Sequence, residues 1–364
     1  MRIGIDAREL CGRATGAGRY LAGLLAEWAT DDRARRHEFV LYAPEPPLAR
    51  FDARRFRVRR VAGRPGVWWE QVRLPRAAVN EQLDVFFSPA YTVPLALDVP
   101  TVVAIHDLSF IAHPEWFRTR EGIRRRWLTR RAAEKARAII TISEFSRGEI
   151  IGRLGTDKAR VHVIPPGVTP PGTGSSRLEP GPSSREIRVL YVGSIFNRRH
   201  VPDLIRAFGE IARSRADASL DLVGDNRSHP CEDVPRTIDA HGLRGRVRWH
   251  AYLADSELRE LYVRARAFAF LSEYEGLGLT PLEALAAGVP PVLLDTPVAR
   301  ESCGDAALYV PVSDLPATVR ALERALFDDD IRARMLAAAP AALARYNWSR
   351  AARDTLAVLE SVVD

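Results

Sequence analysis

Short apolar segments alternate with helical patterns along this chain, and the alternation occurs twice. In the first half, segments rich in β-branched or aromatic residues cover 2–6, 38–43, 84–89, 101–107 and 138–143, and helical patterns cover 16–28 and 119–138. Strands that alternate with helices build parallel sheets that are covered on both faces. The first half is therefore predicted to form a doubly wound α/β domain.

A stretch dominated by Pro, Gly and Ser follows, from Pro165 to Glu186. The alternation then restarts, with strands expected at 187–194, 218–224, 246–252, 267–272 and 290–295 and helices at 201–214, 255–263 and 281–287. We predict an N-terminal domain over 1–168, a linker over 169–186 and a C-terminal domain over 187–345. Two such domains would face each other across a cleft, and ligands of these sheets bind beyond the carboxyl ends of the strands.

The composition is that of a soluble globular protein, with 46% hydrophobic and 27% charged residues among 364. This length fits two domains, and no apolar run approaches the ~18 residues of a membrane span. The start, charged by Arg2 and Asp6, does not have the pattern of a signal peptide. Cys11, Cys231 and Cys303 are odd in number and far apart, which disfavours disulfides and a cysteine zinc site and favours a reducing cytoplasm.

The net charge of +7 comes almost entirely from arginine, since Lys135 and Lys158 are the only lysines. A basic chain suits anionic partners such as nucleic acid, a lipid surface or a phosphorylated small molecule, but codon bias explains the same excess of arginine. The scarcity of lysine disfavours a cofactor that is held as a Schiff base.

Two strand ends in the first half carry candidate functional residues. After the strand that ends at Asp6, a loop with three glycines leads into a helix, so its backbone could approach an anion at the helix N-terminus. A flexible connecting loop would explain the same glycines. His106 and Asp107 close an apolar strand, where they could orient a substrate hydroxyl or accept a proton. A buried structural histidine is the alternative.

Two strand ends in the second half carry the others. Arg198 and Arg199 lie in a turn before a helix that starts near Pro202, and paired guanidinium groups at a helix N-terminus suit a phosphate; a solvated basic loop is the alternative. Glu275 follows a strand and is surrounded by glycines. From Thr280 to Glu283 the residues match a capping box, in which Thr280 caps the helix and Glu283 folds back. The box would account for Glu283 without a ligand.

The spacing of Glu275 and Glu283 within EGLGLTPLEALAAGVPPV resembles the Glu-x7-Glu signature of retaining GT-B glycosyltransferases, and more narrowly of glycosyltransferase family 4, the mannosyltransferase-like group. VGSIFNRR resembles the phosphate turn of that family, with Arg199 in place of a lysine. The segments GIDAREL, TGAGRY, WWEQVRLP, SPAYTVP, AIHDLSF, TISEFSR and VIPPGV resemble its N-terminal landmarks in the same order. The resemblance covers nearly the whole chain.

The resemblance implies two Rossmann-like domains, with the nucleotide sugar bound mainly by the second, and a C-terminal helix within 346–364 that crosses back to the first. It implies a retaining hexosyltransferase that needs no metal or other cofactor. The sequence departs from the family pattern at two positions. Arg199, whose guanidinium presents its N–H groups in a fork, replaces a lysine, which acts as a point charge, and His200 replaces a residue that is often asparagine.

Residue roles transfer to the matching positions. Arg198 and Arg199 would hold the diphosphate, and Glu275 would face the donor sugar. His106 would complete the catalytic set, and Glu283 would accept hydrogen bonds from the ribose. Further donor contacts are expected from Gly16, Ser194, Asn226, Tyr252, Leu253, Gly278, Leu279 and Thr280, and acceptor contacts from Arg19, Tyr20, Glu70, Gln71, Tyr91 and Asp107. With Glu283 at the ribose, only one acid is near the chemistry, which favours attack on the same face over double displacement.

GDP-mannose is the first donor expected from the resemblance, with UDP-glucose or another UDP-sugar as the alternative, and a glycan or lipid-linked glycan as acceptor. The basic segment 122–137 carries Trp127 and could lie on anionic lipid at the inner face of a membrane, or simply be a solvated face. A nucleotide-sugar epimerase and a non-catalytic nucleotide-sugar-binding module stay open. Nucleic-acid binding is disfavoured, because the sequence shows no basic strand with interleaved aromatic residues.

Overall fold

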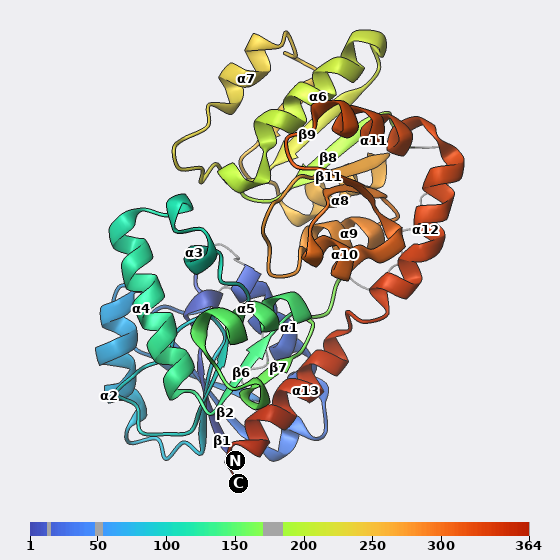
Figure 1. Ribbon diagram of the computed structural model, residues 1–364. Coiled ribbons are helices and arrows are strands. Elements are labelled where there is room, and N and C mark those ends of the chain that lie inside the picture. Colours follow the sequence, from blue (N-terminus) through green and yellow to red (C-terminus); the bar gives the residue numbers. More distant parts are fainter. Residues whose placement is uncertain (13–15, 48–53, 170–184, 364) are drawn as a thin grey trace. The chain divides into compact units, whose positions relative to one another are not determined.

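Each half of the chain forms its own parallel β-sheet (Figure 1). The computed structural model describes residues 1–12, 16–47, 54–169 and 185–363 and divides the chain into two units. Unit 1 comprises Met1–Gly167 and Tyr346–Asp364, and unit 2 comprises Val168–Arg345. Most of the predicted linker over 169–186 lies outside the described residues.

The sheet of unit 1 has seven parallel strands in the order β3-β2-β1-β4-β5-β6-β7. They are β1 (Arg2–Asp6), β2 (Glu38–Ala43), β3 (Phe56–Arg60), β4 (Val85–Ser88), β5 (Thr101–Ala104), β6 (Ala138–Thr141) and β7 (Val161–Val163). The helices are α1 (Gly16–Thr30), α2 (Leu74–Ala78), α3 (Ser109–Ala112), α4 (Thr119–Lys135), α5 (Glu144–Leu154) and α13 (Trp348–Ser361), with a π-helix at Trp69–Arg73. The strand order reverses between β1 and β4, which is where ligands of open α/β sheets bind.

Side chains of β2 face opposite sides of this sheet in turn. Phe39 and Leu41 join the core beneath α1 and α13, whereas Val40 and Tyr42 pack with Trp69 on the other side. Because side chains alternate along a strand, a strand that is apolar at almost every position is covered on both faces. The predicted doubly wound arrangement is confirmed.

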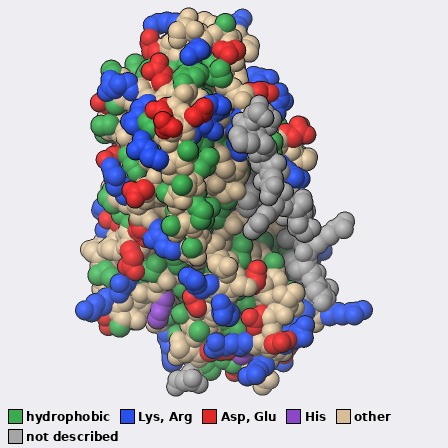
Figure 2. All heavy atoms as spheres, turned by 90° about the vertical axis from the view of Figure 1, so that its right-hand side faces the viewer, with side chains coloured by type: hydrophobic (Ala, Val, Ile, Leu, Met, Phe, Trp, Pro, Cys, Tyr) green, Lys and Arg blue, Asp and Glu red, His purple; other side chains and the backbone are tan. Residues whose placement is uncertain are grey.

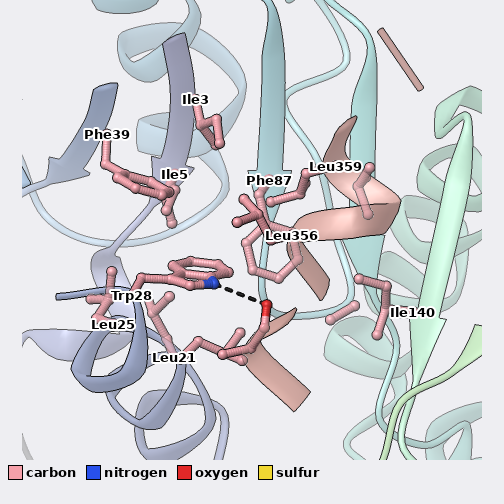
Figure 3. Close-up of a cluster of buried hydrophobic side chains, with 14 of the residues drawn as sticks. Ile3, Ile5, Leu21, Leu25, Trp28, Phe39, Phe87, Ile140, Leu356 and Leu359 are labelled. Atoms are coloured by element: carbon pink, nitrogen blue, oxygen red, sulfur yellow. Dashed lines mark hydrogen bonds between the residues drawn. The ribbon is translucent and has the colours of Figure 1, made fainter. Parts of the chain in front are cut away.

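The C-terminal helix α13 belongs to unit 1, as predicted for 346–364. Figure 3 shows its side chains packed with those of α1 against the sheet, where the indole Nε1 of Trp28 donates to the carbonyl oxygen of Ala352 at 2.9 Å. Burial of these apolar side chains stabilises the end of the chain on the first unit at roughly 25 cal/mol per Å² of apolar surface.

Unit 2 repeats the plan with six parallel strands in the order β10-β9-β8-β11-β12-β13. They are β8 (Arg188–Val192), β9 (Ser219–Val223), β10 (Val247–His250), β11 (Ala267–Phe270), β12 (Pro291–Leu294) and β13 (Leu308–Val310). The helices are α6 (Val201–Ser214), α7 (Val234–Ala240), α8 (Asp255–Arg264), α9 (Leu279–Ala286), α10 (Pro297–Cys303), α11 (Leu315–Phe327) and α12 (Asp329–Leu343). The switch point lies between β8 and β11.

Three strands were missing from the sequence prediction: β3, β7 and β13. All three lie at the edge of a sheet, where fewer side chains are buried. In β3 only Phe56 is buried, and the four residues after it are exposed. β3 therefore lacks the continuous apolar run on which the prediction of the central strands depended, and β7 and β13 are only three residues long.

Charged side chains of both signs are intermixed on the face drawn in Figure 2, rather than forming one uniformly basic patch. Among the helices that the structure describes, none is long and apolar enough to cross a membrane.

Candidate active site

The turn after β8 places two arginines at the carboxyl edge of the second sheet. Gly193 follows the strand with φ of +151°, a 3-10 turn covers Asn197–Arg199, and α6 begins at Val201 with Pro202 in its first turn, as predicted. The Nε of Arg198 donates to the carbonyl oxygen of Tyr274 at 3.2 Å, so this turn is bonded to the loop after β11.

Arg199 makes an ion pair with Glu275. Its Nε and Nη2 lie 2.8 and 2.7 Å from Oε1 of the carboxylate, and its Nη1 donates to the carbonyl oxygen of Ser194 at 2.8 Å. Burial alone would lower the pKa of Arg199, but the Glu275 carboxylate and the Tyr191 hydroxyl together outweigh burial and raise that pKa, so the guanidinium stays charged. The structure thus brings together two of the predicted catalytic residues from separate loops.

Glu275 is held from a second side as well. The hydroxyl of Ser272, two residues after β11 ends at Phe270, donates to Oε1 at 2.8 Å. Glu275 and Gly278 line a small pocket of about 20 Å³, which is room for a water molecule rather than a sugar ring. Ser272 was not among the predicted site residues; its place three residues before Glu275 at a strand end was the available signal.

Helix α9 begins two residues earlier than the capping box requires. The N-cap is Gly278, with φ of +84°, and among the described residues no side chain caps this helix. Leu279, Thr280 and Pro281 form its first turn, so the prediction that Thr280 caps the helix and Pro281 takes its first position is wrong. Glycine has no Cβ and adopts this left-handed conformation without strain. The helix can therefore begin directly after Gly278 without a capping side chain. The first-turn N–H groups have no carbonyl partner within the helix.

Glu283 lies in the second turn of α9 and is 7% exposed. Since the capping box is absent, folding back onto a cap does not explain this buried carboxylate. Its role at the ribose stays a prediction.

The remaining donor candidates lie in loops at the same edge. The hydroxyl of Ser194 donates to Asp225 at 2.6 Å. Both ends of the Asn226 amide are used inside its own loop: Nδ2 donates to the carbonyl oxygen of Glu232 at 2.7 Å, and Oδ1 accepts from Ser228 at 2.6 Å. Tyr252 follows β10 and is 68% exposed, with Leu253 half-buried beside it. Their predicted contacts with the nucleotide remain predictions.

His106 lies at the carboxyl end of the β5 segment in unit 1. Its Nε2 is 2.7 Å from the carbonyl oxygen of Pro89, so Nε2 carries the proton. The ring packs edge-on against Tyr20 and Tyr91, with centroids 4.9 and 5.7 Å away. Burial lowers the pKa of His106, which keeps the imidazole neutral near pH 7. Both the structural and the functional interpretation fit this neutral, oriented ring.

Tyr20 and Asp107 support this histidine region. Tyr20 is 2% exposed, belongs to the core of unit 1 and packs inward against His106; its contact with an acceptor stays a prediction. Asp107 accepts from the hydroxyl of Tyr91 at 2.8 Å and from both the backbone and the hydroxyl of Ser109.

Glu70 belongs to a buried cluster at the switch point of unit 1. Its carboxylate accepts from Arg8 at 2.7 Å and from the hydroxyl of Thr92, and Arg8 also lies 3.2 Å from Asp6. Glu70 is 1% exposed and is held inside this network, and its acceptor contact stays a prediction. Asp6 and Arg8 were missed as members; the position of Asp6 at a strand end was the signal.

The other first-domain candidates have less defined surroundings. Gly16 and Arg19 are exposed at the start of α1, and the loop residues 13–15 before them lie outside the described residues. Gln71 bonds the backbone of Val93 and Leu95 at 2.9 Å and thereby fixes the loop after β4.

The chain is similar to known proteins in both its sequence and its fold. The family model described as glycosyl transferases group 1 matches residues 176–341, and the one described as glycosyltransferase family 4 matches 14–170. Alpha-D-kanosaminyltransferase of Streptomyces kanamyceticus is 30% identical over 281 residues, which are 73% of this chain and 72% of that protein. O-antigen chain mannosyltransferase B of Escherichia coli is 27% identical over 283 residues, 75% of this chain and 73% of that protein.

Among solved structures, sucrose-phosphate synthase from Thermosynechococcus elongatus has a TM-score of 0.77 at 18% identity and covers 99% of this chain and 98% of its own. Anabaena HepE in complex with UDP-glucose has a TM-score of 0.75 at 17% identity, with 99% of each chain covered. These likenesses agree with the two parallel-sheet units described above. The chain therefore belongs to the group 1, family 4 glycosyltransferases, and it is a glycosyltransferase of the GT-B fold.

Proposed function

We propose that this protein transfers a hexose from a nucleotide sugar to a glycan or lipid-linked glycan and retains the configuration at the anomeric carbon. The observation that carries the proposal is the Glu275 carboxylate, held by Arg199 and Ser272 at the switch point of the second sheet. A carboxylate there suits the hydroxyls of a sugar, and the first-turn amides of α9 together with Arg198 suit its diphosphate.

Same-face transfer is the chemistry that these residues support. The bond between the anomeric carbon and the phosphate oxygen breaks while the acceptor oxygen approaches from the same face, and the departing phosphate takes the acceptor proton. Arg198 supplies positive charge where negative charge develops on the leaving group. A covalent sugar adduct on Glu275, trapped with a fluorinated donor and detected by mass spectrometry, would contradict this route. We also propose that no metal is required, and activity that is lost in EDTA and restored by Mg²⁺ would refute that.

GDP-mannose is the proposed donor, on the strength of the likeness to the O-antigen chain mannosyltransferase. A thermal-shift screen with GDP-mannose, UDP-glucose, GDP and UDP tests it, because a bound donor raises the melting temperature according to its concentration relative to Kd. With a positive donor, nucleotide release that depends on an acceptor glycan supports transfer. Conversion of the donor without acceptor indicates an epimerase, and binding without turnover indicates a binding module.

The exposed face of α4 supports peripheral contact with an anionic membrane. Ile123 and Trp127 are each 56% exposed and lie four residues apart, on one face of the helix, with exposed arginines at 124, 130 and 131 around them. Apolar side chains flanked by arginines match the pattern of helices that lie in a membrane interface.

Flotation with liposomes of phosphatidylglycerol and phosphatidylcholine tests this contact. Trp127→Ser should reduce flotation with anionic liposomes, whereas Trp68→Ser is the matched control, since Trp68 is 68% exposed outside α4. No flotation of the unaltered protein, or an equal loss in both variants, would remove the proposal.

A further inference from the structure

The loop that follows β4 contacts the imidazole of His106 in two ways. The carbonyl oxygen of Pro89 accepts from Nε2 at 2.7 Å, and the ring of Tyr91 lies edge-on to the imidazole, with the centroids 5.7 Å apart. Within the described part of the chain, Nδ1 of His106 has no hydrogen-bond partner. The neutral ring therefore donates to the protein through Nε2 and keeps the lone pair of Nδ1 for a donor group of a ligand.

The backbone of Tyr91 is strained. Its φ is +59°, and the amide of Thr92 donates to the carbonyl oxygen of Ala90 at 2.7 Å, which closes a γ-turn around Tyr91. A γ-turn with positive φ is rare, and a bulky side chain seldom adopts this left-handed conformation. The amide of Tyr91 also donates to the carbonyl oxygen of Ala104, the last residue of β5, at 2.7 Å. Such strain persists only where surrounding contacts impose it, and it gathers at functional sites.

Three side chains from outside the loop hold this turn. The hydroxyl of Thr92 donates to the Glu70 carboxylate and accepts from Arg8 at 3.2 Å. Gln71 bonds backbone groups further along the same loop at 2.9 Å. Glu70 and Gln71 belong to the π-helix of unit 1, a rare form that is frequent at functional sites. The buried network at the switch point therefore imposes the conformation of the turn around Tyr91.

The side chain of Tyr91 is fixed as firmly as its backbone. Its hydroxyl donates to Asp107 at 2.8 Å. Its ring packs edge-on against Phe110, with centroids 5.8 Å apart, and the central carbon of the Arg125 guanidinium lies 5.8 Å from the ring centroid. These contacts leave the ring one orientation, in which its other neighbour is the imidazole of His106.

We propose that Tyr91 is a positioning residue whose ring, held by the strained turn, fixes the imidazole of His106 for sugar transfer. The inference rests on the proposed function, since it takes His106 to act on a substrate of that reaction. An imidazole that turned freely would offer its two nitrogens in many directions, and a small misplacement of such a group costs a large part of the rate. The inference also gives Glu70 and Arg8 a task, because they hold the turn that carries the ring.

NMR of the imidazole nitrogens in the protein without ligand tests the positioning, with the His106 signals identified by their loss in His106→Asn. The unaltered protein should show one protonated and one unprotonated nitrogen, as for a single tautomer. Tyr91→Asn removes the ring but keeps the turn, because asparagine tolerates the left-handed conformation. In this variant the two nitrogen signals should move towards each other. The pKa of His106 should rise towards 6.5, because water reaches the ring while the carboxylates of Asp107 and Glu9 stay in place.

Two further variants separate the ring from the hydroxyl and from general packing. Tyr91→Phe keeps the ring, so the nitrogen signals of His106 should stay as they are. Phe117→Leu is the matched control, since Phe117 is also half-buried and packs on Phe110, with centroids 6.3 Å apart, and near Arg125. Its loss should leave the His106 signals unchanged.

Initial rates with GDP-mannose or UDP-glucose as donor give the second readout. Tyr91→Asn should lower kcat by about tenfold or more, as for a displaced group at the reacting centre. The KM values of donor and acceptor should stay within about twofold, since no ligand contact is lost. Tyr91→Phe should restore kcat to within about twofold of the unaltered protein.

The two readouts divide the outcomes. Unchanged nitrogen signals and pKa of His106 in Tyr91→Asn would overturn the inference, whatever happens to the rate. A Tyr91→Phe variant that loses as much kcat as Tyr91→Asn, or that raises the KM of the acceptor, would assign the hydroxyl a direct ligand contact and overturn it too. Absence of sugar transfer by the unaltered protein would count against the proposed function alone, because the nitrogen signals are read without a donor.

Discussion

His200 and Glu273 join the turn after β8 to the loop after β11: Nε2 of the imidazole bonds Oε1 of the carboxylate. Nδ1 of the same ring lies 3.2 Å from Asp203, and the amide of Glu273 donates to the carbonyl oxygen of Arg198 at 2.9 Å. The histidine therefore lies between two carboxylates, with the Glu232 carboxylate also acting on it. It also has a left-handed backbone with φ of +47°, a conformation that asparagine tolerates well.

The stability that His200 contributes should depend on pH. Hydrogen bonds to Asp203 and Glu273 raise the pKa of His200 above its ordinary value of 6.5. A raised pKa means that the folded state binds the proton more tightly, so this stabilisation is complete below the unfolded value and is lost as pH rises through the folded value. Urea unfolding should show a difference between the unaltered protein and His200→Asn that shrinks from pH 6 to pH 9. The exposed His241→Asn is the control, and a constant difference would contradict the prediction.

Glu275→Gln should keep the fold and lose most of the transferase activity. Glutamine preserves the size of the side chain but removes the negative charge beside Arg199 and the proposed cationic transition state. We expect a loss of about 100-fold in kcat or more with the fold kept, and a lower melting temperature because the largely buried Arg199 loses its charged partner. Initial rates with a donor from the thermal-shift screen provide the measurement, and a fully active variant would refute the assignment.

Thr280→Ala should have almost no effect on stability, because Gly278 is the N-cap of α9. A capping threonine would cost about 1 kcal/mol on removal, whereas we expect less than about 0.5 kcal/mol here. The matched control is Asn347→Ala, since Asn347 caps α13 through a bond to the amide of Arg350 at 2.9 Å. Equal losses of unfolding free energy in the two variants would show that Thr280 is a cap after all.

Glu283→Gln tests the predicted ribose contact apart from any capping. The amide keeps the shape of the buried side chain but replaces one acceptor oxygen with a donor, so a diol that donates two hydrogen bonds loses one of them. We expect binding of the nucleoside diphosphate to weaken by about tenfold or more, consistent with a lost bond to a charged group. Calorimetry with UDP and GDP measures this, and unchanged affinity for both would leave Glu283 with a structural role only.

The unfolding free energy of Asp6→Asn should rise relative to that of the unaltered protein as pH increases. Burial raises the pKa of Asp6 to about 6, and Arg8 offsets only part of that effect. Protonated Asp6 contributes stability that is complete below the pKa of aspartate in the unfolded chain, near 3.9. This contribution is lost as pH rises through the pKa in the folded protein, about 6. Between pH 4.5 and 7.5, the unfolding free energy of the unaltered protein should fall by about 2 kcal/mol relative to the variant. The control is Asp32→Asn at an exposed position, for which the difference in unfolding free energy should not change with pH. If the difference between the unaltered protein and Asp6→Asn also stays constant, the raised pKa of Asp6 is contradicted.

Periodicity alone predicted the central strands of both sheets and several helices, because buried parallel strands need apolar runs and these are visible residue by residue. The helix over 201–214 has the predicted bounds. The edge strand β3 was missed since four of its five residues are exposed. The predicted start of α9 was wrong because Gly278, in a left-handed conformation, is the N-cap, so the helix begins before Thr280, the first residue of the predicted capping box.

The sequence by itself determined the α/β class, the strand ends at which functional residues gather, and the pair Glu275 and Glu283, since these depend on local periodicity and spacing. Only the tertiary structure decided which partners those residues have. It pairs Arg199 with Glu275, which is 76 residues away in the sequence, and it buries Glu70 together with Asp6 and Arg8. Such pairings arise because parallel strands bring distant loops to one edge of a sheet, and no local pattern records which loops will meet.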